Sequence, residues 1–244
     1  MQLEFILNPA RRACDDASLE VDGRRIALVL VRHPRARRYV LRLRPDGLAR
    51  VTIPRGGSAT EARRFADRNR DWLGRQIQRL ASRPNLPAAW LVGTEILLRG
   101  EPVKIEADVS GEAGVVRLGG EVIRVPDPAA DLRPAIHRHL WRLAAKELPP
   151  RVLEHATLHG LSVRRVTVRN QRSRWGSCSR RGTISLNWRL IQAPGFVRDY
   201  IVIHELMHLR EMNHSRRFWR EVERACPCYK TAERWLKQHG FLLK

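Results

Sequence analysis

The stretch VIHELMHLREMNHS, Val202–Ser215, brings three histidines and a glutamate together in one short segment. On a helix, positions four apart lie one turn above each other, so His204 and His208 project from the same face. Apolar side chains cover most other directions around this helix: Ile201, Val202, Ile203, Leu206, Met207 and Leu209. A polar His-Glu-His group in so apolar a helix needs partners, and a metal ion supplies them. The stretch therefore predicts a buried helix that carries a metal site.

The spacing within this helix is the HExxH arrangement. Two imidazoles on one face can share a Zn²⁺ ion, each at about 2.0–2.1 Å from it. Glu205 lies roughly 100° further around the helix, where it reaches a water on the metal without ligating the metal itself. One helical turn thus supplies two candidate zinc ligands, His204 and His208, and one candidate general base, Glu205.

A catalytic zinc site needs a third protein ligand and keeps one position open for water. His214 lies ten residues after His204, which is the spacing of the third histidine in HExxHxxGxxH enzymes. Glu211 stands where those enzymes have the glycine that permits a sharp turn. Because asparagine tolerates a left-handed conformation, we expect the turn to be made at Asn213 instead.

Other candidate ligands carry weaker signals. A glutamate from the following segment, Glu221 or Glu223, is the alternative third ligand, although His214 is favoured. Two thiols in Cys226-Pro227-Cys228, without a second pair, are a weak metal signal, so this segment is interpreted as structural. Six further histidines are interpreted as surface or packing residues: His33, His137, His139, His155, His159 and His239.

Length and composition predict a globular chain. It has 244 residues, 43% of them hydrophobic, which is enough for a sizeable core. No apolar run approaches the roughly 18 residues needed to span a bilayer, and the N-terminus shows no cleavage pattern of a signal peptide. Its four cysteines are too scattered for a disulfide framework, which suits a reducing compartment. We therefore expect a cytoplasmic protein without a membrane partner.

The net charge of +21 would draw the surface toward polyanions, with nucleic acid as the first candidate. The basic residues are spread along the chain, however, and no known nucleic-acid-binding module is visible. Solvated arginine-rich faces explain most of this charge. Nucleic acid is kept as a possible partner through the basic surface.

The first half of the chain predicts short strands. Apolar or alternating runs predict three of them: 24–32, 38–45 and 48–54. Ser58 and Glu61 form a capping-box signature, and the apolar spacing that follows predicts one amphipathic helix up to Leu80. Two hairpins that turn at glycine are expected over 95–107 and 114–126. Residues 1–128 are therefore predicted to form a β-rich N-terminal region.

The Pro126–Pro128 stretch is the predicted domain boundary. A helix is expected from Leu132, and Pro149-Pro150 should kink or split it. Strands follow over 163–169 and 182–191, and three helical segments close the chain. Residues 129–244 form the predicted second domain.

Four motifs occur here in the order and at the distances of a known family: NQRSRWGSC (Asn170–Cys178), ISLNWRLI (Ile184–Ile191), HELMHLREMNHSRRFW (His204–Trp219) and CPCYK (Cys226–Lys230). In these motifs the chain resembles the YgjP-like metallopeptidases, zincin-type proteins related to the SprT-like and WLM metalloproteases. The likeness extends upstream to RRYVLRL, VTIP and DWL, so it covers most of the chain. One departure is Cys228, where an aspartate is expected.

The resemblance implies a zinc-dependent hydrolase of polypeptides, with His204, His208 and His214 as zinc ligands and Glu205 as catalytic base. It implies an α+β fold: a zincin-like catalytic domain, in which the active-site helix lies under a small mixed β-sheet, preceded by the β-rich N-terminal region. In the expected reaction the metal activates a water, and Glu205 takes its proton and passes it to the leaving amine.

Several points stay open at this stage. Arg172, Arg174 and Trp175 either line the cleft or brace their loop against the active-site helix. Arg174 and Tyr229 are candidates for stabilising the oxyanion. Two other readings of the whole protein are a structural or partner-directed zinc site, which an intact Glu205 disfavours, and a DNA-associated protease or nucleic-acid-binding protein.

Overall fold

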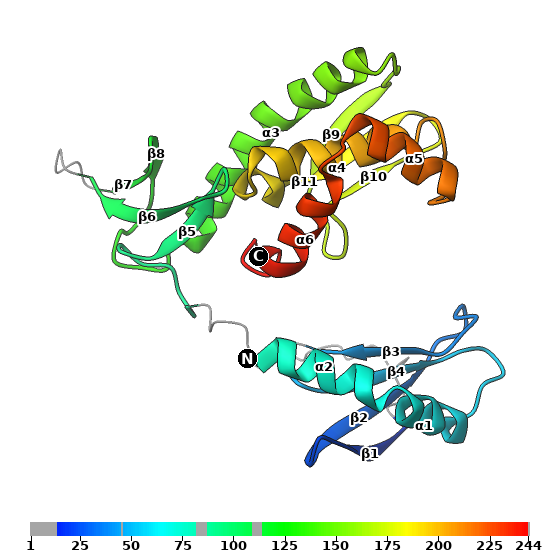
Figure 1. Ribbon diagram of the computed structural model, residues 1–244. Coiled ribbons are helices and arrows are strands. Elements are labelled where there is room, and N and C mark those ends of the chain that lie inside the picture. Colours follow the sequence, from blue (N-terminus) through cyan, green and yellow to red (C-terminus); the bar gives the residue numbers. More distant parts are fainter. Residues whose placement is uncertain (1–13, 45, 82–86, 109–113, 244) are drawn as a thin grey trace, which may run out of the picture. The chain divides into compact units, whose positions relative to one another are not determined.

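The computed structural model describes residues 14–44, 46–81, 87–108 and 114–243 (Figure 1). The chain divides into two compact units, Met1–Asn85 and Leu86–Lys244. Each unit has its own cluster of buried apolar side chains. The boundary between the units precedes the expected one at Pro126–Pro128, because the two predicted hairpins share a core with the helices that follow them. The predicted division into 1–128 and 129–244 as functional domains stays a prediction.

The first unit is a four-stranded sheet with two helices. The strands follow the order β1-β2-β4-β3 and have these bounds: β1 Cys14–Val21, β2 Arg24–Arg32, β3 Val40–Leu43 and β4 Ala49–Ile53. β2 and β4 are parallel, and the other pairs are antiparallel. β1 has no counterpart among the predicted strands.

The predicted amphipathic helix of this unit is two helices, α1 (Ala59–Arg68) and α2 (Arg70–Ala81). The capping box is present, because the Ser58 side chain accepts from the Glu61 N–H and the Glu61 carboxylate accepts from the Ser58 N–H. Asn69 ends the first helix, and its side chain donates to the Phe65 carbonyl at 2.7 Å. This local bond competes with the helical pattern, which explains the break.

The second unit begins with a four-stranded antiparallel sheet in the order β5-β6-β7-β8. Its strands have these bounds: β5 Glu95–Leu98, β6 Glu101–Ala107, β7 Val115–Leu118 and β8 Glu121–Arg124. The long helix α3 (Arg133–Leu158) continues through Pro149 and Pro150 and is not split there. Its buried residues continue past the prolines to Val152 and Ala156, so tertiary packing outweighs the local cost of proline.

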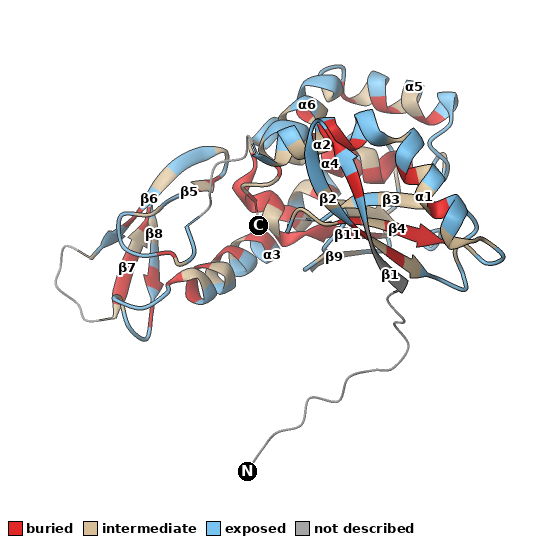
Figure 2. Ribbon diagram, turned by 90° about the horizontal axis from the view of Figure 1, so that it is seen from below, coloured by how far each residue is buried: buried red, intermediate tan, exposed pale blue. Residues whose placement is uncertain are grey.

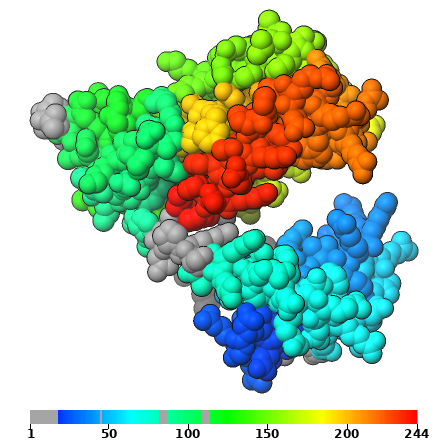
Figure 3. Space-filling model, viewed as in Figure 1, coloured from blue at the N-terminus to red at the C-terminus, as the bar shows by residue number. Residues whose placement is uncertain are grey.

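The rest of the second unit is a three-stranded mixed sheet with three helices. The sheet has the order β10-β11-β9, with β9 Arg165–Arg169, β10 Gly176–Cys178 and β11 Thr183–Asn187. β11 is parallel to β9 and antiparallel to β10. The predicted strand over 182–191 therefore ends at Asn187, whose side chain accepts from the Arg189 N–H and begins the 3₁₀ helix η1 (Trp188–Gln192). The helices are α4 (Gly195–Met207), α5 (Arg216–Ala225) and α6 (Tyr229–His239), and their atoms form one continuous surface in Figure 3.

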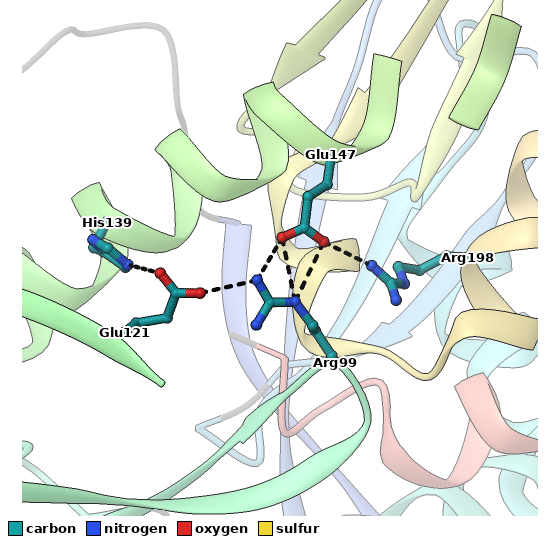
Figure 4. A network of polar contacts seen from close by, with 5 residues as sticks. All are labelled: Arg99, Glu121, His139, Glu147 and Arg198. Carbon is teal, nitrogen blue, oxygen red and sulfur yellow. Dashed lines mark hydrogen bonds and ion pairs between the residues drawn. The ribbon is translucent and has the colours of Figure 1, made fainter. Parts of the chain in front are cut away.

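Figure 4 shows the ionic network that joins α3 to its neighbours within the second unit. The Arg99 guanidinium, from the turn between β5 and β6, lies 2.6 Å from the Glu147 carboxylate of α3 and 3.0 Å from Glu121 of β8. Arg198 of α4 reaches Glu147 at 3.3 Å, and His139 reaches Glu121 at 3.1 Å. The network thus fixes the first turn of α4 against α3, a helix that is itself tied to the β5–β8 sheet.

No helix within the described ranges is long and apolar enough to cross a membrane.

Candidate metal centre

Helix α4 carries the HExxH segment and is the most enclosed helix of the second unit (Figure 2). It packs against β10, β11 and α3, and both α5 and α6 lie on it. The predicted apolar residues are buried from Ile201 to Met207, whereas Leu209 lies beyond the end of the helix and is half-buried. The helix ends at Met207, and His208 is its C-cap with helical backbone angles. His204 and His208 therefore keep the one-turn relation that the sequence predicts.

The structure brings His204, His208 and His214 into one cluster. One ring nitrogen from each lies within 4.8 Å of the others. The Nε2 atoms of His204 and His214 are 3.0 Å apart. Two ligands of a tetrahedral zinc ion are separated by roughly 3.3 Å, given bonds of about 2.0–2.1 Å. Within the described ranges this is the only group of three or more His, Cys, Asp or Glu side chains that could hold a metal ion.

The surroundings of His204 and His208 favour the neutral imidazole, which is the form that binds a metal. Burial, together with the neighbouring His208 and His214, lowers the pKa of His204 to about 4, so that its ring is neutral at neutral pH. Burial also lowers the pKa of His208, although a hydrogen bond with the Glu211 carbonyl acts the other way. In that bond Nδ1 of His208 donates to the carbonyl at 3.1 Å. In this tautomer of His208, Nε2 carries no proton, and its lone pair is free to bind a metal ion.

The turn that delivers His214 is built without a left-handed residue at Asn213. Asp22 and Arg99 are the only non-glycine residues with positive φ among those described, so the predicted left-handed turn is wrong. Hydrogen bonds make the reversal instead: the N–H groups of Arg210 and Glu211 both donate to the Met207 carbonyl at 3.0 Å. A tightened helix end of this kind needs no glycine.

The alternative third ligands lie elsewhere. Glu221 is paired with Arg210 at 2.6 Å and with Arg224 at 3.3 Å. Neither Glu221 nor Glu223 belongs to the histidine cluster. Phe218 of α5 contacts the cluster instead, stacked on the His208 ring at 4.5 Å between centroids. α5 therefore provides an apolar wall to the site.

Glu205 lies beside the cluster and is buried, with 6% of its surface exposed. Burial raises the pKa of its carboxyl to about 7, and the positive charge of Arg174 opposes that rise. The carboxylate is packed directly against the backbone of Gly176, where a Cβ atom would meet both Cγ and Oε1 of Glu205 at 2.6 Å. Only glycine at this point of β10 lets the strand approach the candidate base so closely.

Part of the motif Asn170–Cys178 lines the cavity over the histidines, and the motif is also held by hydrogen bonds to β11. A cavity of about 420 Å³ lies over the histidines and is lined along one side by Arg174 to Cys178. Arg172 is not among its lining residues and lies at an adjoining cavity. The buried Asn187 amide donates to the carbonyls of Gln171 at 2.8 Å and Arg174 at 3.2 Å. The end of β11 thereby holds the loop that leads into β10.

Two residues of the site escaped the sequence analysis. Gly176 gives no signal in sequence, because its role is a backbone approach to a residue far along the chain. Tyr200 lines the cavity one turn before His204, and its hydroxyl donates to Glu233 at 3.1 Å. Its spacing of four residues from His204 is a signal that could have found it. Of the two oxyanion candidates, Arg174 lines the cavity, whereas Tyr229 stacks on Trp219.

The thiols of the second unit stay outside the cluster. Cys178 lines the cavity, and burial together with the charge of Glu205 raises its pKa to about 11, so it stays protonated. Cys226 and Cys228 are free, with their sulfurs 3.9 Å apart.

Comparison with known proteins shows the family of the chain. A family model described as YgjP-like, metallopeptidase domain, matches residues 37–239. The chain belongs to the YgjP-like metallopeptidase family. Among solved structures, it is similar to the crystal structure of the metallopeptidase zymogen of Pyrococcus abyssi abylysin, with 28% identity, a TM-score of 0.34, and coverage of 37% of this chain and 93% of that chain. No curated protein matches the chain.

The family match spans both units of the chain and includes every residue of the histidine cluster. It makes the protein a metal-dependent hydrolase whose substrates are polypeptides. As a YgjP-like chain, it is α+β with three small sheets and six α-helices in its described part.

Proposed function

We propose that this YgjP-like protein is a zinc metallopeptidase in which His204, His208 and His214 hold the metal and Glu205 is the general base. One observation carries the proposal: three imidazoles converge within 4.8 Å of one another, beside the buried Glu205 side chain, at an open cavity that all four residues line. No fourth potential ligand joins them in the described ranges. Three protein ligands with an open position are the pattern of catalytic zinc, whereas structural zinc takes four.

A bound zinc ion supplies Lewis-acid chemistry, because it polarises the scissile carbonyl and makes a water molecule more acidic. Glu205 accepts the proton of the attacking water and returns it to the amine that leaves. Its close packing on Gly176 restricts where the carboxylate can lie, so the acceptor oxygen is already in place before a substrate arrives. Arg174, at the rim of the same cavity, can donate to the developing oxyanion.

The edge of the mixed sheet supports an extended polypeptide as the substrate. β10 pairs with β11 on one side and is the end strand of its sheet. All three residues of β10 line the cavity, together with His204 and Glu205. An extended chain can add to such an edge through main-chain hydrogen bonds, which places its peptide bonds next to the metal site.

Metal analysis tests the assignment of the ligands. The purified protein should bind about one zinc ion per chain. His204→Ala and His208→Ala should lose it, because two remaining imidazoles do not hold zinc tightly. His214→Ala should weaken zinc binding far more than Glu221→Ala or Glu223→Ala in a chelator competition. Full occupancy in the His204→Ala/His208→Ala double variant, or a larger effect of either glutamate, would contradict the assignment.

A nucleic-acid partner has no support from the family match or from the described structure, and it is not proposed. A cytoplasmic location also stays a prediction.

A further inference from the structure

A second cavity of about 390 Å³ adjoins the catalytic one. Arg174 and Trp175 line both cavities, which makes them the wall between the two. Two more arginines, Arg172 and Arg189, line the second cavity with no acidic residue among its other lining groups. Three arginines therefore line a small concave space next to the cavity of the histidine cluster.

These guanidinium groups lack the carboxylate partners that other arginines of the unit have. Arg151, for example, forms a bidentate ion pair with Asp199, in which Nε and Nη2 each donate to one carboxylate oxygen at 2.7 Å. Among the described residues, no ion pair joins a carboxylate to Arg172, Arg174 or Arg189, although the charge of Arg174 acts on the Glu205 carboxyl from a longer distance. Arg189 donates to the Asn170 side chain and lies over the Trp188 ring at 4.6 Å. It is half-buried, and burial lowers its pKa, as expected for a charge without a counter-ion.

The backbone around this cavity is held in place. Asn187, which is buried, bonds the carbonyls of Gln171 and Arg174. The same asparagine side chain accepts from the Arg189 N–H at 3.2 Å. One residue thus fixes the backbone on both sides of the cavity, so the arginines project from a pre-organised frame.

The direction of β10 relates the cavity to the substrate. Arg172 and Arg174 precede β10 in the chain, so their cavity lies off the end of the strand that Gly176 begins. A substrate that adds to β10 in the antiparallel sense runs past Cys178 first and Gly176 later. Residues on the C-terminal side of the scissile bond then reach the arginines.

We propose that this arginine pocket binds a carboxylate of the substrate on the C-terminal side of the scissile bond. The carboxylate is an acidic side chain or the C-terminal carboxylate of a short peptide. The guanidinium fork matches the two oxygens of a carboxylate, which gives both affinity and orientation. The inference rests on the proposed peptidase function, since it names the class of substrate that the same site takes.

Peptide binding to zinc-loaded Glu205→Gln protein tests the pocket without hydrolysis. The probes are labelled ten-residue peptides that differ by Glu, Gln or Lys at one position, each made with a free or an amidated C-terminus. Glu at one position should bind about three- to tenfold more tightly than Gln, which corresponds to modest, partly exposed ion pairs. A preference for the free C-terminus over the amide would identify that carboxylate as the source instead.

Arg172 is exposed and lines the arginine pocket but not the catalytic cavity. Substitutions of Arg172 therefore test carboxylate binding without changing a residue of the catalytic cavity. Adding Arg172→Glu should abolish the preference for Glu and favour Lys, while Arg172→Gln should only abolish it. Arg181→Glu is the matched control, since it makes the same charge change on an exposed arginine in the turn after β10. The control should keep the preference for Glu.

Mass spectrometry of peptides cut by the active protein then places the acidic residue relative to the scissile bond. Three results would overturn the proposal. The Glu and Gln peptides could bind equally, the preference for Glu could survive Arg172→Glu, or the acidic residue could lie on the N-terminal side of the scissile bond. An oligonucleotide that binds through Arg172 where carboxylate peptides do not would also overturn the proposal. If the preference for Glu peptides is present but the zinc-loaded parent protein cleaves no peptide, the result would contradict the peptidase function and still support carboxylate binding by the arginine pocket.

Discussion

At the scale of single residues, the contact between Gly176 and Glu205 decides where the candidate base lies. A methyl group at position 176 would come within 2.6 Å of the Glu205 side chain. The clashing atoms, Cγ and Oε1, belong to a side chain and not to the backbone, so a new rotamer of Glu205 can relieve the contact and the fold should tolerate Gly176→Ala. The carboxylate, however, would leave its place over the cavity.

Gly176→Ala should therefore keep zinc affinity and thermal stability close to those of the parent, while kcat/KM for a peptide falls. Displacement of a catalytic group by about 1 Å can cost roughly 10²-fold. Gly120→Ala is the matched control, because nothing lies within 4 Å of a Cβ at that position. An alanine at 176 that leaves kcat/KM unchanged would show that the close contact does not position the base.

The histidine cluster could be predicted from the sequence, because four-residue and ten-residue spacings are local properties of one helix and its turn. The role of Gly176 could not, since the carboxylate that it faces lies 29 residues later and the two meet only through the sheet. Asn213 failed as a predicted turn residue for a related reason. Backbone hydrogen bonds to the Met207 carbonyl make that turn whatever side chain follows.

At the scale of elements, Asp199 fixes α4 to α3. The Arg151 guanidinium donates to both carboxylate oxygens of Asp199 at 2.7 Å, and His155 lies 3.4 Å away. Burial would raise the pKa of Asp199, but the bonds from Arg151 outweigh burial and lower it below 3.8. A carboxyl whose pKa is lower in the folded state stabilises the fold above its unfolded pKa. That stabilisation is lost as the pH falls through the folded value.

Asp199→Asn should thus reduce the free energy of unfolding of the second unit by about 1–2 kcal/mol at pH 7, given the partial exposure of the pair. The difference from the parent should shrink as the pH falls below 4 and vanish in stronger acid. Chemical denaturation at several pH values measures it. Glu154→Gln is the control, because Glu154 is bonded to the same arginine at 2.7 Å but is mostly exposed. A pH-independent difference would exclude the ion pair as its cause.

Element types were easier to predict than element ends. The hairpins over 95–107 and 114–126 are strand pairs as expected. The strand that was expected to run to Ile191 stops at Asn187, because that side chain caps the next turn. The helix predicted up to Leu80 breaks at Asn69 for a similar local reason. In both cases a side-chain bond to the backbone overrides an apolar periodicity that continues through it.

At the scale of the whole molecule, the two units bury separate cores. The first core is drawn from residues 19–73 and the second from 90–243. The histidine cluster lies in the second unit only. A ligand that binds the folded form stabilises only the part that forms its site.

Zinc should accordingly raise the unfolding temperature of one calorimetric transition and leave another unchanged. Saturation at 100 times the dissociation constant contributes about 2.7 kcal/mol, which for a unit of this size is roughly 5–10 °C. Zinc-free and zinc-loaded protein, scanned at the same concentration, give the comparison. His204→Ala is the control and should show no zinc-dependent shift. A shift in every transition would mean that the two units unfold together.

The most direct test of the central claim is the hydrolytic activity of Glu205→Gln. Glutamine keeps the size of the side chain but cannot take a proton, and it does not alter the three histidines. With zinc bound at the level of the parent, hydrolysis of an unstructured protein such as casein should fall by roughly 10²–10⁴-fold. Zinc content measured on the same samples separates loss of the base from loss of the metal. Activity within about a factor of two of the parent, at equal zinc content, would contradict the role of Glu205 as the base.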